Sequence, residues 1–124
     1  MNKKEVDNLI EKFISDPEAF TLYRGENHIN QGGLHFTTDK DWASKFGDKI
    51  LEGKLPIDSK IKLITNSDFE EGFKLGILSE QQLWDSIFEK GYDAIIGHDP
   101  MNSDMLDIII NPKHLELFKV SVSI

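Results

Sequence analysis

The sequence predicts a single α+β domain whose strands form mixed or antiparallel sheets. Helical patterns stand at the start and in the middle of the chain, and short β-prone runs cluster around them. Many connections between these runs are too short for parallel crossovers, which need about a dozen residues or more. A length of 124 residues with 39% hydrophobic residues suffices for one domain with one core.

An amphipathic helix is expected to open the domain over residues 3–15. Apolar residues recur there at helical spacing: Val6, Leu9, Ile10, Phe13 and Ile14. Asp16-Pro17 ends the pattern, because proline disfavours the helical conformation in the residue before it. Short strands are then expected over residues 21–24 and 34–37, on either side of a polar loop that contains glycine.

A second, short helix is expected after these strands, because Thr38 or Asp39 can cap its first turn. We expect Gly47 to end this helix in a left-handed turn. Its inward-facing side chains are expected to be Trp42, Ala43 and Phe46.

The middle of the chain indicates two further strands, over residues 49–55 and 60–64. The turn-forming run Pro56-Ile57-Asp58-Ser59 divides them. Residues 67–78 then indicate one or two helical turns. Two glycines are expected to break these turns: Gly72 and Gly76.

Ser79-Glu80-Gln81-Gln82 has the capping-box pattern and predicts a helix that Gly91 ends. Its buried stripe is expected to be Leu83, Trp84, Ile87 and Phe88. Strands are predicted to close the chain over residues 93–97, 106–110 and 115–122. Ile108-Ile109-Ile110 is apolar on both faces, so its strand is expected in the centre of a sheet.

The composition excludes several classes of function. The chain has no cysteine, which rules out disulfides, thiolate metal sites and a cysteine nucleophile. No apolar run approaches the roughly 18 residues of a membrane span, and the first residues lack the apolar core of a signal peptide, so we expect a cytoplasmic protein. The formal charge of −8 disfavours nucleic-acid binding and favours a protein partner with a basic surface, although acidity can also serve solubility alone.

Three segments combine a strand with a polar residue at its edge and an adjacent glycine or turn. They are Tyr23-Arg24-Gly25, Gly33-Leu34-His35-Phe36-Thr37-Thr38 and Leu106-Asp107-Ile108-Ile109-Ile110. In this order they resemble the three signatures of the ADP-ribosyltransferase superfamily. In that family the first strand carries Arg or His followed by Gly, the second carries Tyr or a Ser-Thr-Ser run, and a later strand starts with the catalytic acid.

The resemblance covers most of the chain. The runs Gly91-Tyr92-Asp93-Ala94-Ile95-Ile96-Gly97 and Asp107-Ile108-Ile109-Ile110-Asn111-Pro112 look like the C-terminal half of small phage and bacterial members. Residues 36–43 are similar to their strand and the following helix, which lines the nicotinamide pocket. The likeness to phage-borne members, including anti-CRISPR proteins, suggests an effector that inactivates a host defence complex by ADP-ribosylation.

The resemblance implies that NAD is the cofactor and that its ADP-ribose is transferred to a protein target. Breaking the bond between nicotinamide and ribose develops positive charge on the ribose, so the site must fix the dinucleotide and place negative charge near that sugar. Asp107 would take the position of the catalytic glutamate. Arg24 would bind the ribose or phosphates of NAD, and the Gly25 backbone would approach the nicotinamide amide closely.

Residues of the second strand would complete the site. His35 would replace the tyrosine of the poly-ADP-ribosyltransferase pattern, and it shares a strand face with Thr37. Thr37 and Thr38 resemble the Ser-Thr-Ser run. One aromatic ring would stack on nicotinamide, with these candidates: Phe36, Trp42 and Phe46. No metal site is expected, because the remaining histidines lack ligand spacing: His28, His98 and His114.

These residues also have plainer interpretations. Arg24 could be a surface cation paired with Glu26, Asp107 an exposed acid at a strand start, and His35 a core or rim histidine. Two departures from the family pattern matter as well. Met105 stands where arginine-modifying relatives have Glu or Gln, so arginine is not supported as the acceptor. Aspartate at position 107 is also one methylene shorter than the family's glutamate.

The same sequence raises alternatives to the transferase function. A degenerate member could keep the fold and act as a binding module or inhibitor through its acidic surface, in which case NAD binding would be lost. A toxin that hydrolyses NAD and a transferase acting on nucleic acid form a second class, and the net charge disfavours nucleic acid. An RNA 2′-phosphotransferase is rejected, because its phosphorylated substrate needs several basic residues and Arg24 is the only arginine of the chain.

Overall fold

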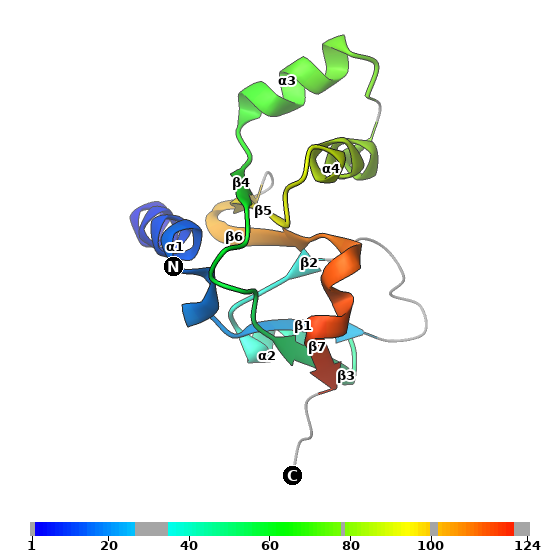
Figure 1. The fold of residues 1–124 in the computed structure, drawn as a ribbon. Coiled ribbons are helices and arrows are strands. Elements are labelled where there is room, and N and C mark those ends of the chain that lie inside the picture. Colours follow the sequence, from blue (N-terminus) through cyan, green and yellow to red (C-terminus); the bar gives the residue numbers. More distant parts are fainter. Residues whose placement is uncertain (1, 27–34, 78, 100–101, 121–124) are drawn as a thin grey trace.

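Two β-sheets and the helices packed on them make up the structure, an α+β fold as predicted (Figure 1). The computed structural model describes residues 2–26, 35–77, 79–99 and 102–120. In chain order the elements are α1 (Lys3–Ser15), the 3₁₀ turn η1 (Pro17–Ala19), β1 (Leu22–Glu26), β2 (His35–Phe36), α2 (Lys40–Ser44), β3 (Lys49–Gly53), β4 (Ile61–Leu63), α3 (Asn66–Lys74), α4 (Glu80–Glu89), β5 (Ala94–Asp99), β6 (Asn102–Ile110), η2 (Pro112–Leu117) and β7 (Phe118–Val120).

The strands form one antiparallel and one mixed sheet. The first sheet has the order β1-β3-β7 and is antiparallel throughout. The second has the order β2-β6-β5-β4, in which only the β4–β5 pair is parallel, and α3 and α4 lie in the crossover between those two strands. An antiparallel bridge between Tyr23 and Thr37 joins the sheets, with backbone N···O distances of 2.7 and 2.8 Å.

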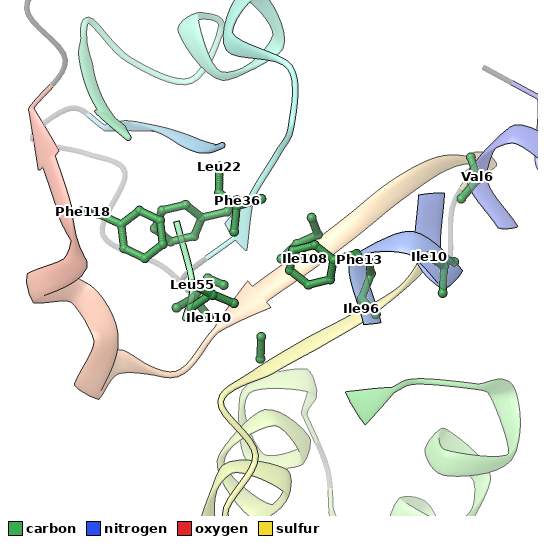
Figure 2. Close-up of a cluster of buried hydrophobic side chains, with 11 residues drawn as sticks. Val6, Ile10, Phe13, Leu22, Phe36, Leu55, Ile96, Ile108, Ile110 and Phe118 are labelled. Atoms are coloured by element: carbon green, nitrogen blue, oxygen red, sulfur yellow. The ribbon is translucent and has the colours of Figure 1, made fainter. Parts of the chain in front are cut away.

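Strand β6 is covered on both faces, because its isoleucines alternate between two hydrophobic clusters. Ile108 and Ile110 belong to the first cluster (Figure 2), and Ile109 belongs to the second. The first cluster takes its helical members from α1: Val6, Ile10 and Phe13. The second takes them from α4: Leu83, Trp84 and Ile87. The expected central position of these isoleucines is confirmed, and each contributes on the order of 1.5–3 kcal/mol through burial.

Several helix ends follow the polar caps and glycines read from the sequence. Helix α1 has its predicted bounds. The Asp39 carboxylate accepts backbone hydrogen bonds at the start of α2, and the Ser79 hydroxyl accepts one at the start of α4. Gly76 and Gly91 follow α3 and α4 with φ of 85° and 99°, the left-handed conformation that glycine adopts without steric cost.

The expectations for α2 need correction. Ala43 is buried as expected, but Phe46 is 49% exposed and lies beyond the end of the helix. Its ring packs at 5.7 Å against Trp42, which is only half-buried. Gly47 is not left-handed, and the chain leaves the helix through Lys45 in the ordinary right-handed conformation. The reason is that α2 approaches β1 with its backbone, so the small Ala43 faces the sheet instead of the aromatic rings.

Two further predictions are wrong in their boundaries. Gly72 does not break α3, because a capping box at Thr65 and the packing of Phe69 against the second hydrophobic cluster hold the helix and offset the cost of about 1 kcal/mol that glycine carries within it. The strand predicted over residues 115–122 begins only at Phe118, since Pro112 opens a 3₁₀ turn that runs to Leu117. Its last two positions, and Leu34 of the second predicted strand, lie outside the described residues.

Candidate functional site

Residues predicted for the site lie on three strands that the topology brings together. Arg24 lies on β1, His35 on β2 and Asp107 on β6. In the β2–β6 pair His35 stands opposite Ile109, so Asp107, two positions away, shares the face of His35. Beyond Phe36 the chain crosses to β1 at the Tyr23–Thr37 bridge. The two sheets therefore meet beside these side chains.

The imidazole ring of His35 is hydrogen-bonded to the carboxylate of Asp107. His35 Nδ1 lies 2.9 Å from Asp107 Oδ1, and the two side chains are 46% and 21% exposed. The hydrogen bond with Asp107 raises the pKa of His35 above its ordinary value of 6.5, against the opposing effect of burial. The negative charge of Glu80 raises it further, and the positive charge of Arg24 lowers it. A raised pKa makes the ring a stronger base than a free histidine.

Arg24 is buried, with 5% of its surface exposed. Its Nε donates to Glu26 Oε2 at 3.2 Å, and its Nη1 donates to the backbone carbonyl of His35 at 3.4 Å. The plainer interpretation, a pair with Glu26, is therefore present, with the guanidinium buried and the Glu26 side chain 27% exposed. Removing one partner of such a pair is costly, because it leaves the other charge without compensation. The guanidinium also ties β1 to the backbone at the start of β2.

Gly25 and Phe36 have packing roles in the structure. A Cβ atom at position 25 would lie only 1.8 Å from the carbonyl oxygen of Ala43, so glycine permits the contact between β1 and α2. The ring of Phe36 lies 4.4 Å from that of Phe118, centroid to centroid (Figure 2). Phe36 is 4% exposed, which leaves almost no surface for stacking on nicotinamide. It is a core residue here, not a site residue.

Thr37 and Phe46 keep surface that a ligand could contact. Thr37 is partly exposed, and its hydroxyl oxygen accepts the backbone N–H of Asp39 at 3.1 Å. Phe46 is 49% exposed just after the end of α2, and its ring packs against Trp42. Contacts of these two residues with a cofactor stay predictions.

Glu80 is a charged neighbour of the site that the sequence did not indicate. It is the first residue of α4, and its negative charge acts on His35. The capping-box pattern at Ser79 predicted where α4 starts. Nothing in the sequence indicated that this start lies near β2, because the two residues are 45 positions apart and are brought together only by the tertiary fold.

Histidine–aspartate pairs occur at two other places in the described chain. His98 Nε2 lies 2.7 Å from Asp7 Oδ1, and His114 Nε2 lies 2.7 Å from Asp93 Oδ1. Neither involves a residue predicted for the site. Among the described residues, no group of three or more His, Asp or Glu side chains could hold a metal ion.

No helix in the described part of the chain is long and apolar enough to cross a membrane. Comparisons with protein-family models, with curated proteins and with solved structures find no match to this chain.

Proposed function

We propose that this chain is an NAD-dependent ADP-ribosyltransferase that modifies a protein target with a basic surface. The observation that carries the proposal is the 2.9 Å contact between His35 and Asp107, with Arg24 Nη1 at 3.4 Å from the His35 carbonyl oxygen. These three residues come from the three segments that resemble the family's signatures. Their meeting at one place is what a transferase site requires, and it did not follow from the sequence pattern alone.

The exposed groups of this cluster suit the ribose of NAD. Asp107 is 21% exposed, and a carboxylate has about four lone-pair positions, so it can accept a ribose hydroxyl while keeping its bond to His35. Arg24 is largely enclosed and engaged with Glu26 and the His35 backbone, so we assign it chiefly to positioning. Its positive charge also favours the nearby binding of the diphosphate of NAD.

In the proposed reaction the bond between the ribose C1 carbon and the nicotinamide nitrogen breaks, and its electron pair leaves with nicotinamide. Asp107 stabilises the positive charge that develops on the ribose, an interaction that is strongest in the transition state. A nucleophilic side chain of the target then forms a bond to C1. With Nδ1 directed at Asp107, His35 Nε2 accepts the proton that the nucleophile loses, in the manner of a carboxylate-oriented general base.

The test combines transfer and binding measurements on matched variants. Isotope-labelled NAD is incubated with the protein in a bacterial lysate, and labelled protein is quantified, while calorimetry measures NAD affinity. Asp107→Asn is expected to reduce labelling about a hundredfold or more and to leave NAD affinity nearly unchanged. His98→Gln disrupts the similar pair with Asp7 and is the control, with labelling at the wild-type level.

Two outcomes would contradict the proposal. Equal labelling by the wild type and Asp107→Asn would remove Asp107 from the chemistry. A wild-type protein that does not bind NAD at millimolar concentration would favour the alternative, a binding module or inhibitor that acts through its acidic surface.

A further inference from the structure

Helices α3 and α4 lie at one end of the molecule, beyond β4 (Figure 1). Side chains from both helices line an apolar groove. Its volume is about 370 Å³. We call it the α3–α4 groove and define it by Asn66, Phe69, Phe73, Ile77, Glu80 and Leu83. Its inner side rests on the second hydrophobic cluster, to which Leu83 belongs and against which Phe69 and Ile77 pack. The groove therefore has a fixed apolar floor.

Two large apolar side chains near the end of α3 are exposed to solvent. Phe73 is 68% exposed and Leu75 is 82% exposed, the two highest values among the exposed large hydrophobic residues of the described chain. Single exposed apolar residues are ordinary, but Phe73 lines the groove, and Leu75 follows it by two positions as the residue that caps the end of α3. A small ligand held within the groove would leave Leu75 in water, whereas a protein segment lying across the groove covers both.

The segment that holds α3 and α4 is also acidic. Residues 66–89 contain six Asp or Glu residues and one Lys, a net charge of −5 out of −8 for the whole protein. Glu80 lines the groove. Glu70 adjoins it on the surface of α3, because it follows Asn66 by four positions and precedes Phe73 by three. An apolar floor with carboxylates on both helices selects against acidic partners, including a second copy of this chain.

We propose that the α3–α4 groove binds a basic segment of another protein, whose apolar side chains insert between the two helices. The segment's Lys or Arg residues face Glu70 and Glu80, and its apolar residues cover Phe73 and Leu75. Glu80, which lines the groove, also acts electrostatically on His35 of the candidate site. We assign this segment to the protein that is modified, and this assignment rests on the proposed function. Binding in the groove itself needs neither NAD nor Asp107.

The experiment uses a fluorescein-labelled amphipathic peptide of about 18 residues, built from Leu and Lys at helical spacing and long enough to form a helix. Its affinity for the full chain is measured by fluorescence anisotropy, and the contacted amides are located by two-dimensional NMR. A peptide with Glu in place of every Lys tests the charge requirement. Phe73→Ser tests the apolar requirement, and Ile57→Ser, at a 56% exposed position in the turn before β4, is the matched control.

The wild type is expected to bind the Leu/Lys peptide and to show shifted amides in α3 and α4. Phe73→Ser should weaken binding about tenfold or more, because the lost contact is a large aromatic side chain. Ile57→Ser should bind like the wild type, the Leu/Glu peptide should not bind, and added salt should weaken the complex.

Equal binding by Phe73→Ser and Ile57→Ser, or shifted amides outside α3 and α4, would overturn the inference. So would failure of the Leu/Lys peptide to bind, or self-association of the protein that Phe73→Ser abolishes, which would assign the groove to a second copy. Asp107→Asn separates the two proposals, because it should bind the peptide normally. Lost labelling activity with retained peptide binding leaves the groove intact as a docking surface. Retained labelling by Phe73→Ser, together with its expected loss of peptide binding, refutes only the assignment of the bound segment to the modified target.

Discussion

The pairing of His35 with Asp107 can be tested without knowing any substrate, by replacing Asp107 with asparagine. Asparagine keeps the shape of the side chain and an acceptor oxygen but removes the negative charge. Because the hydrogen bond and charge of Asp107 raise the pKa of His35, that pKa should fall toward its ordinary value in Asp107→Asn. The fall measures the coupling between the two side chains directly.

The size of this coupling follows from how exposed the pair is. A hydrogen bond to a charged group contributes about 1.5–3 kcal/mol when enclosed, whereas exposed ion pairs contribute about 0.2–1 kcal/mol. His35 is 46% exposed and Asp107 is 21% exposed, so solvent screens the interaction substantially. We therefore expect a coupling free energy of about 1 kcal/mol in a double-mutant cycle with His35→Gln.

The sign of the pH dependence is fixed by the direction of the shift. A group whose pKa is raised on folding stabilises the folded state fully below its unfolded pKa, here about 6.5, and loses this contribution as pH rises through the folded pKa. The coupling should accordingly be larger at about pH 6 than at about pH 9.

Ring-proton NMR can follow the titration of all four histidines, and urea unfolding monitored by tryptophan fluorescence gives the free energies. His98, which pairs with Asp7, is the internal control, and its ring-proton signals should be the same in both proteins. A His35 pKa that does not change in Asp107→Asn, or a coupling that is the same at both pH values, would refute the reasoning.

Two further substitutions test contacts that hold the fold together. Gly25→Ala should lower the free energy of unfolding by about 1–3 kcal/mol or more in urea denaturation, because the new Cβ would meet the Ala43 carbonyl at 1.8 Å. Asp93→Asn should cost about 1–3 kcal/mol at neutral pH, because the carboxylate accepts the Lys60 N–H and pairs with His114, each at 2.7 Å. Burial acts to raise the pKa of Asp93, but these bonds outweigh it and hold the pKa below 3.8, so the cost should disappear as pH falls through that lowered pKa.

Each of these substitutions has a matched control. Alanine at Gly72 would have its nearest contact at 3.5 Å, an ordinary distance, so Gly72→Ala should stabilise α3 by about 0.5–1 kcal/mol. A comparable loss in Gly25→Ala and Gly72→Ala would mean that the close approach of α2 does not matter. Asp58→Asn, in an exposed turn, should leave stability unchanged at every pH, and a loss equal to that of Asp93→Asn would contradict the assigned bonds.

The sequence predicted those parts of the fold that depend on local pattern. The spacing of Val6, Ile10 and Phe13 gave α1 its correct bounds, and the apolar run Ile108-Ile109-Ile110 placed β6 inside a sheet. Both features arise from periodicity, which a single segment carries by itself.

Features that depend on contacts between distant segments were not predictable in this way. Gly72 looked like a helix breaker because the packing of Phe69 against the second hydrophobic cluster, which helps to hold α3, is invisible in the local sequence. The expectation that Phe46 faces inward failed because the inward side of α2 is decided by Gly25 on another strand. Within the site, Arg24, His35 and Asp107 were identified from motifs, but the 2.9 Å contact between the last two depends on the β2–β6 register.

The antiparallel bridge between Tyr23 and Thr37 hydrogen-bonds the two sheets to each other. Arg24 lies next to this bridge in the first sheet. His35 and Asp107 belong to the second sheet, where their side chains meet across the β2–β6 pair. The hydrogen bond from Arg24 Nη1 to the His35 carbonyl also crosses between the sheets, so the spacing between the guanidinium and the carboxylate depends on how the two sheets are placed. The ring of Phe118 on β7 packs against Phe36 on β2, so a smaller side chain at position 118 is expected to change that spacing from a distance.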